Sequence, residues 1–276
     1  LPVRVNLDGT FYDESATLLN ILYNYQISSY GTPLRNGLKK AGQFFAGNYL
    51  KPSTFISQVN SDSYPYFKAD KGGSCQQAFT ILFTDGYYNG GSPYLGNADG
   101  DSSSDYDGQS YADTVSNTLA DVAMHYYERD LKPTYADKVP LIPGVDSNNT
   151  QHMVTFTVAF GLNGSLSSNP QDNTSEFPWP EPVSNTDTTV DDMRHAAWNG
   201  RGQFLSAGNP KILVESLNAA IQNISDRSGT AAAGSVRRPT TGTTPTSMEA
   251  TSTTGTLFRP PDSARMCFSN APPPSS

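Results

Sequence analysis

Hydrophobic residues recur along most of the chain with two different spacings, one typical of strands and the other of helices. Apolar residues at every second position predict a strand over residues 1–8. Apolar residues three and four positions apart predict a helix around 18–23 and a second helix from 33 to about 47. The second helix directly follows Thr32, and Pro33 suits its first position because an N–H group there would have no helical partner.

Two nearly continuous apolar runs lie further along the chain. FTILF at 79–83 and MVTFTVAFG at 153–161 predict buried strands, the first covered on both faces of a parallel sheet. Similar spacing arguments predict helices over 111–128, 190–198 and 210–225 and a short strand over 202–207. This alternation indicates an α/β fold in which 79–84 and 153–160 are adjacent parallel strands.

The composition changes near residue 229. Thr, Ser, Pro and Gly make up 28 of the 48 residues from 229 to the end. Such a segment buries too little apolar surface to offset the entropy lost on ordering. We therefore expect one α/β domain over 1–227 and a linker or disordered tail over 228–276.

The overall charge excludes one class of partner. The chain has 18 Lys and Arg against 26 Asp and Glu, a net charge of −8. Nucleic-acid binding needs clustered basic residues, so we expect no nucleic acid partner. No apolar run reaches the roughly 18 residues of a membrane span, so we expect no membrane span. A polar, weakly charged, loop-rich chain suits an extracellular surface.

The chain ends and the cysteines leave two questions open. The first residues, LPVRVNLDG, lack the pattern of a secretory leader, and we interpret the chain as a mature piece or a fragment. Cys75 and Cys267 cannot form a dense disulfide framework. They form either one bridge or two inert thiols.

Motifs of common enzymes are absent from the sequence. It contains no GxSxG nucleophile turn, no Walker phosphate loop and no HExxH zinc motif. We expect the three histidines, His125, His152 and His195, to be packed or surface residues without a catalytic role.

Two oxygen-bearing side chains stand where an open α/β sheet presents its ligands. Thr32 precedes a predicted helix, and Asp85 ends a predicted strand, at the carboxyl edge of the sheet. A hydroxyl and a carboxylate that meet there suit a hard cation such as Mg²⁺ or Ca²⁺. In the alternative interpretation, Thr32 caps the helix and Asp85 is an ordinary turn residue.

The loop NADGDSSSDYDG contains a second group of oxygen donors. EF-hand geometry is excluded because Ser102 stands where the motif needs Gly and Gly108 where it needs Glu. An irregular Ca²⁺ loop and a merely solvated acidic loop both remain open. The candidate ligands are Asn97, Asp99, Asp101, Asp105 and Asp107.

Five blocks of sequence, in order, resemble the N-terminal region of the PilY family of type IV pilus biogenesis proteins and tip-associated adhesins. They are GTPLRNGLKKAGQFF, CQQAFTILFTDGYYNG, YADTVSNTLADVAMHYYERDL, QHMVTFTVAFG and DDMRHAAWNGRGQFLSAGNPKILVESLNAAIQNI. The resemblance covers roughly 1–227. It implies a Rossmann-like von Willebrand factor type A domain, which a β-propeller normally follows in the family.

The resemblance also implies a metal site built from three loops. Thr32 matches the second loop, and Asp85 matches the third through its TDG sequence. The first loop, DxSxS, has a similar string only at 13–17, which lies too close to Thr32 to accommodate the intervening elements. We therefore expect the first strands and the first loop upstream of Leu1, so that the domain lacks them here.

From this resemblance, we expect a protein of pilus biogenesis and adhesion that binds its ligand through a metal-edge α/β domain. The implied partners are minor pilins and a host or matrix surface ligand. The implied location is extracellular, at the bacterial surface or pilus tip, after export and in association with the outer membrane. Two alternatives are a secreted metal-dependent hydrolase and a structural spacer with a degenerate metal site.

Overall fold

A parallel sheet forms the centre of the chain. The computed structural model describes residues 13–26, 31–48 and 65–233, so the strand expected over 1–8 lies outside the described residues. The strands are β1 (Ala78–Thr84), β2 (Met153–Phe160) and β3 (Arg201–Ala207), in the order β1-β2-β3. Both pairings are parallel, and Ala78 lies opposite Met153. The prediction of two adjacent parallel strands is confirmed.

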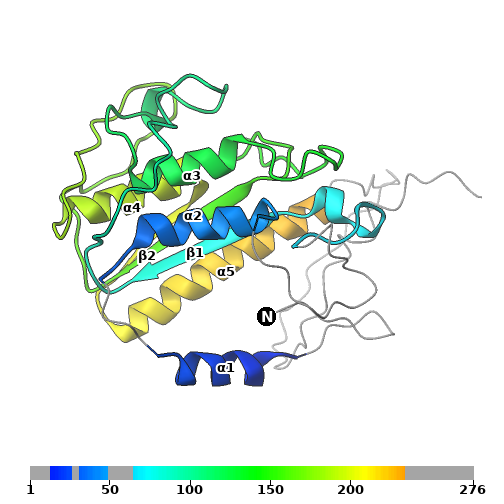
Figure 1. Ribbon diagram of the computed structural model, residues 1–276, viewed down its shortest axis with the longest axis horizontal. Helices are drawn as coiled ribbons and strands as arrows, with labels where there is room; N and C mark the ends of the chain where they lie inside the picture. The colour runs from blue at the N-terminus through cyan, green and yellow to red at the C-terminus, as the bar shows by residue number, and fades with distance from the viewer. Residues whose placement is uncertain (1–12, 27–30, 49–64, 234–276) are drawn as a thin grey trace, which may run out of the picture.

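Helices cover both faces of this sheet (Figure 1). One face carries α2 (Leu34–Phe45), α3 (Leu119–Glu128) and α4 (Thr188–Asn199), and the opposite face carries α5 (Pro210–Ala233). A further helix, α1 (Ser15–Asn24), buries none of its residues. The short 3₁₀ helices are η1 (Ala69–Lys71), η2 (Gly73–Cys75) and η3 (Gln109–Tyr111). These layers confirm the α/β class and are compatible with a Rossmann-like arrangement.

The central strand divides the apolar core into two parts. Met153 and Ala159 of β2 pack with residues of α2, α3 and α4. Val154 and Phe156 point to the other face, where Ala220 of α5 covers them. Because the side chains of a strand alternate between faces, a fully apolar strand needs cover on both sides. The buried pattern of β2 matches the prediction for the 153–161 run.

The prediction of burial on both faces is wrong for the 79–83 run. Among the described strands, β1 stands at the edge of the sheet and pairs only with β2. Ile81 is 37% exposed and Phe83 is 46% exposed. The physical reason is that α5 packs mainly against β2 and β3, so among the described residues on this face of β1 only Phe79 joins the core beneath that helix.

Two helix boundaries also differ from the predictions. α3 begins at Leu119 rather than near 111, because Thr118 and Asp121 form a capping box that starts the helix there. α5 continues to Ala233, beyond the predicted end of this helix at 225, and ends in three alanines, which favour helix strongly. Residues 234–276 of the expected tail lie outside the described residues. So does Cys267, whereas Cys75 is disulfide-bonded.

Candidate functional site

The end of β1 and the loop before α2 meet at the carboxyl edge of the sheet. Thr32 and Asn89 exchange two hydrogen bonds, from Thr32 N to Asn89 Oδ1 at 2.9 Å and from Asn89 N to Thr32 O at 3.0 Å. A Cβ atom added to Gly86 would lie 3.6 Å from Thr32 Oγ1. The Thr32 hydroxyl therefore lies beside the turn that follows Asp85. The Asp85 side chain itself is exposed, and whether it shares a metal ion with Thr32 stays a prediction.

A buried carboxylate, that of Asp192, connects the turn after β1 to two helices. Asp192 of α4 accepts hydrogen bonds from Leu119 N at 2.8 Å and Ala120 N at 3.0 Å, and a further one from the Tyr88 hydroxyl. These are the first N–H groups of α3, which have no partner within the helix. Asp192 thus joins α3, α4 and the turn after β1 into one unit. Its pKa is raised by burial, against the lowering effect of these hydrogen bonds.

The acidic loop does not gather its five candidate ligands at one point. Asp101 and Asp107 approach each other, because both accept a hydrogen bond from Ser103 N, at 2.8 and 3.0 Å. Asp105 is exposed. The Asn97 side chain donates to Asp113 O at 2.9 Å and accepts from Gly100 N at 2.7 Å. Whether this loop binds Ca²⁺ stays a prediction.

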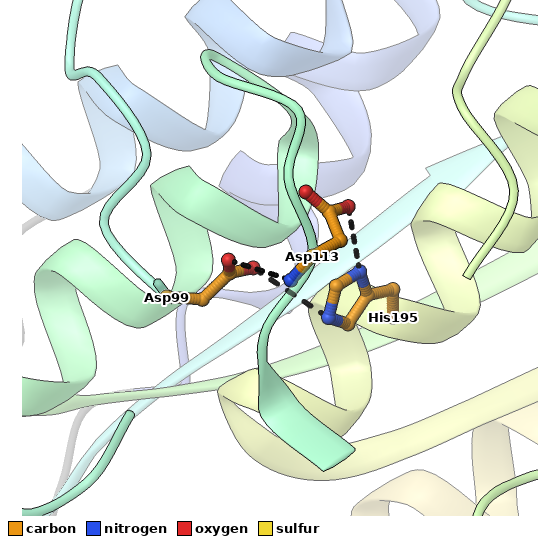
Figure 2. A group of neighbouring side chains, drawn as sticks. All are labelled: Asp99, Asp113 and His195. Carbon is orange, nitrogen blue, oxygen red and sulfur yellow. Dashed lines mark hydrogen bonds and ion pairs between the residues drawn. The ribbon is translucent and has the colours of Figure 1, made fainter. Parts of the chain in front are cut away.

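Asp99 points away from the rest of the loop and joins a buried cluster with Asp113 and His195 (Figure 2). Asp99 Oδ2 lies 3.5 Å from His195 Nε2, and Asp113 Oδ2 lies 3.6 Å from His195 Nδ1. The two carboxylates therefore face different nitrogens of one imidazole ring. His195 Nε2 also lies 2.6 Å from the Tyr111 carbonyl oxygen. Asp99 and His195 are 0% and 1% exposed.

Two carboxyl groups in and beside this cluster have pKa values well above those of ordinary aspartates. Burial, together with the nearby carboxylates of Asp121 and Asp113, raises the pKa of Asp99 to about 9, against two hydrogen bonds that lower it. One of these bonds comes from Asn199 Nδ2, at 2.8 Å from Asp99 Oδ2. Burial also raises the pKa of Asp121 to about 6. Negative charge is therefore concentrated here under conditions that disfavour it.

Aromatic residues hold the cluster in place. The Trp179 ring stacks on His195 with centroids 4.0 Å apart and planes 9° apart. The Arg201 guanidinium lies over two rings, 3.6 Å from the centroid of Tyr111 and 4.2 Å from that of Tyr127. The first contact joins the loop before α4 to α4, and the other two join the loop before α3, and α3 itself, to the start of β3.

Sequence reasoning identified only one member of the cluster. It placed Asp99 in the acidic loop, did not single out Asp113, and expected His195 to be a packed residue. His195 is indeed packed, but against two carboxylates. The three residues are spread over almost a hundred positions, so no local spacing links them. Two carboxylates and an imidazole can hold a divalent cation or form a hydrogen-bonded network.

No helix in the described part of the chain combines the length and the apolar character that crossing a bilayer requires.

Comparison with known proteins finds relatives of one kind. No protein-family model and no solved structure matches the chain. It is 34% identical over 240 residues to the type IV pilus biogenesis factor PilY1 of Pseudomonas aeruginosa strain PAK, covering 75% of this chain and 20% of that protein. It is also 34% identical to PilY1 of strain PAO1 over 230 residues, covering 71% of this chain and 19% of that protein. The chain spans about a fifth of the length of these curated relatives. Over its aligned residues, the chain is similar to the PilY1 type IV pilus biogenesis factors, as the five sequence blocks suggested.

Proposed function

We propose that this chain is a surface-exposed module of type IV pilus biogenesis and adhesion, and that it acts by binding rather than by catalysis. The single observation that carries the proposal, beside the similarity to PilY1, is the meeting of Thr32 with the turn after Asp85. In a parallel α/β sheet, ligands bind at this carboxyl edge. The domain would be of the von Willebrand factor type A kind, with the crevice as its ligand-binding edge.

The residues at this crevice fit a hard cation. Among the described residues, none hydrogen-bonds the Thr32 hydroxyl or the Asp85 carboxylate, so both oxygens are available. Hydroxyl and carboxylate oxygens are ligands that Mg²⁺ and Ca²⁺ accept. A bound ion would give the crevice a positive centre for an acidic group of the ligand. Thr32 and Asp85 would hold it, and Asn89 would keep Thr32 in position.

The partners and the location follow from the same proposal. The partners would be minor pilins and a host or matrix surface ligand, and the location the bacterial surface or the pilus tip, after export and in association with the outer membrane. The relatives are named as pilus biogenesis factors, which supports a pilus-associated role.

The acidic loop is proposed as a separate Ca²⁺-responsive element. Asp101 and Asp107 share the Ser103 N–H group, so their like charges lie close together. A divalent cation would convert this repulsion into attraction. Calorimetric titration with Ca²⁺ should show binding that the double change Asp101→Ala/Asp107→Ala removes. Equal heats for both proteins would reject the element.

The crevice is best tested in the complete protein in its own bacterium. The change Asp85→Ala would be made in the chromosomal gene, and surface pili and adherent cells would be counted. We expect a clear loss of both, and no loss for Asp172→Ala, which removes an exposed carboxylate that bonds only within its own loop. Normal piliation and adherence of the Asp85→Ala strain, with normal protein levels, would reject the proposed site.

A further inference from the structure

The Asp99–Asp113–His195 cluster has the donor atoms of a metal site and shares no residue with the crevice at the strand ends. Two ligands bound to one ion at about 2.1 Å in a tetrahedron lie about 3.4 Å apart. Asp99 Oδ2 and His195 Nε2 are 3.5 Å apart. An ion could therefore bind between these two atoms with little movement of either.

A second, independent observation comes from Asn199. Its side chain is 0% exposed, and its amide group faces Asp99, since Nδ2 lies 2.8 Å from Asp99 Oδ2. The amide oxygen Oδ1 has no hydrogen-bond partner among the described residues, although it is fully buried. Burial of an oxygen without a hydrogen-bond partner is unfavourable unless a bound group satisfies it. A half-turn of the amide would direct this oxygen toward the same space as Asp99 Oδ2 and His195 Nε2.

The surroundings of His195 complete the pattern. Histidines that bind a metal usually donate their second ring N–H group to a carboxylate or a carbonyl. With a metal on Nε2, the ring proton would sit on Nδ1, which faces Asp113 Oδ2 at 3.6 Å (Figure 2). The Tyr111 carbonyl oxygen, 2.6 Å from Nε2, accepts the Nε2–H proton in the metal-free chain, so binding of the ion would release that proton and move the carbonyl away from Nε2.

We propose that Asp99 Oδ2, His195 Nε2 and the side-chain oxygen of Asn199 bind a divalent ion of the zinc class, with Asp113 as the carboxylate that positions His195. The imidazole nitrogen decides the class, since Zn²⁺ accepts mixed nitrogen and oxygen ligands whereas Ca²⁺ takes oxygen ligands. Asp99 and Asn199 stand at the two ends of the site, one in the loop and one at the end of α4. The ion would therefore fasten the 97–113 loop to α4.

Charge and access support this site. Three carboxylates, Asp99, Asp113 and Asp121, lie close together, and no Lys or Arg in the described ranges forms an ion pair with them. A dication would neutralise charge that burial otherwise penalises. Asp113 also lines an open cavity of about 420 Å³, together with Glu176, Glu181 and Trp179. Asp113 is the member of the cluster that lines this acidic cavity, so a cation would approach the site from there.

Calorimetric titration with Zn²⁺ tests the proposal on the purified chain after dialysis against a chelator. We expect one Zn²⁺ per chain. Loss of a single positioning carboxylate typically costs about 10- to 100-fold in affinity, so Asp113→Asn should weaken binding by that factor. Asp99→Asn replaces a charged ligand by a neutral amide, and His195→Gln removes the imidazole nitrogen, so each should weaken binding by about 100-fold or more. The controls Asp172→Asn and His125→Gln should bind as the unchanged chain does.

A second measurement keeps the test decisive if Asp99→Asn or His195→Gln does not fold, which circular dichroism will show. Co²⁺ bound to the unchanged chain should give the visible absorption of a low-symmetry nitrogen and oxygen site, and Zn²⁺ but not Ca²⁺ should abolish it. The proposal is overturned if the unchanged chain binds no Zn²⁺, if folded Asp99→Asn and His195→Gln proteins bind it normally, or if Ca²⁺ displaces Co²⁺.

Discussion

Replacing Asp192 should destabilise the domain more than any exposed substitution, because one carboxylate serves three donors. In Asp192→Ala, Leu119 N, Ala120 N and the Tyr88 hydroxyl lose their acceptor in a fully buried place. A buried donor left without a partner costs about 1–3 kcal/mol. Water that enters the vacated space can accept hydrogen bonds from some of these donors. We therefore expect the free energy of unfolding to fall by about 3–6 kcal/mol. Domains of this kind have about 5–15 kcal/mol in total.

Urea denaturation, followed by circular dichroism and by tryptophan fluorescence, measures this change. Asp192→Asn keeps one acceptor oxygen and should lose less, about 1–3 kcal/mol, so it remains measurable if the alanine variant does not fold. Asp187→Ala is the matched control, since Asp187 precedes the same helix and makes no cap hydrogen bond with its side chain. An exposed change of this kind should stay within about 0.5 kcal/mol.

Hydrogen exchange gives a local readout of the same prediction. The amides of Leu119 and Ala120 should exchange faster in Asp192→Asn than in the Asp187→Ala protein, because only the first removes their carboxylate acceptor. An Asp192→Ala protein that unfolds within 1 kcal/mol of the unchanged chain would show that the carboxylate is not what holds α3 to α4.

Three further predictions concern packing, pH and association. Gly42→Ala should destabilise by about 1–3 kcal/mol in urea, because a Cβ atom there would meet Tyr126 ring atoms at 2.3 Å. Gly37→Ala in the same helix has open space and should be neutral or stabilising; equal effects would contradict the contact. Burial raises the pKa of Asp99 in the folded chain to about 9. As the pH rises, Asp99 therefore loses its proton in the unfolded chain before it does so in the folded chain. The free energy of unfolding should fall from about pH 4 to pH 9 for this reason. In chelator, Asp99→Asn should flatten that fall, and an unchanged pH profile would refute the assignment. Phe83→Lys places a charge on the exposed edge of β1 and should reduce self-association in light scattering; unaltered scattering would argue against edge pairing.

The pattern of the chain was sufficient for the class of fold and for the position of Thr32 near the turn after Asp85. Apolar runs and helical stripes predicted the parallel pairing of β1 with β2 and most of the helices, because burial acts on each element separately and leaves a local periodicity. Thr32 and Asp85 were predictable for a similar reason. Both flank elements whose ends a parallel sheet must bring to one edge.

Other features were decided by tertiary structure or by competition between two local signals. The exposure of Ile81 and Phe83 depends on which strands α5 covers, and no property of FTILF carries that information. The start of α3 depends on a capping box at Thr118 that competed with an apolar stripe beginning at 111. The position of α5, far along the chain, decided how exposed β1 is. A choice between two local signals decided where α3 begins.

The separation of Asp99 from its neighbours shows most clearly what the sequence alone does not predict. By sequence, Asp99 is one of several acidic residues in a polar loop, and the alternation of Asn97, Asp99 and Asp101 suggests a shared ligand. In the structure, the backbone turns Asp99 inward to Asn199 and His195, while Asp101 stays at the surface. The local sequence determined that the loop is acidic and polar. Only the packing of α4 against that loop determined which carboxylate is buried, because burial depends on residues almost a hundred positions away.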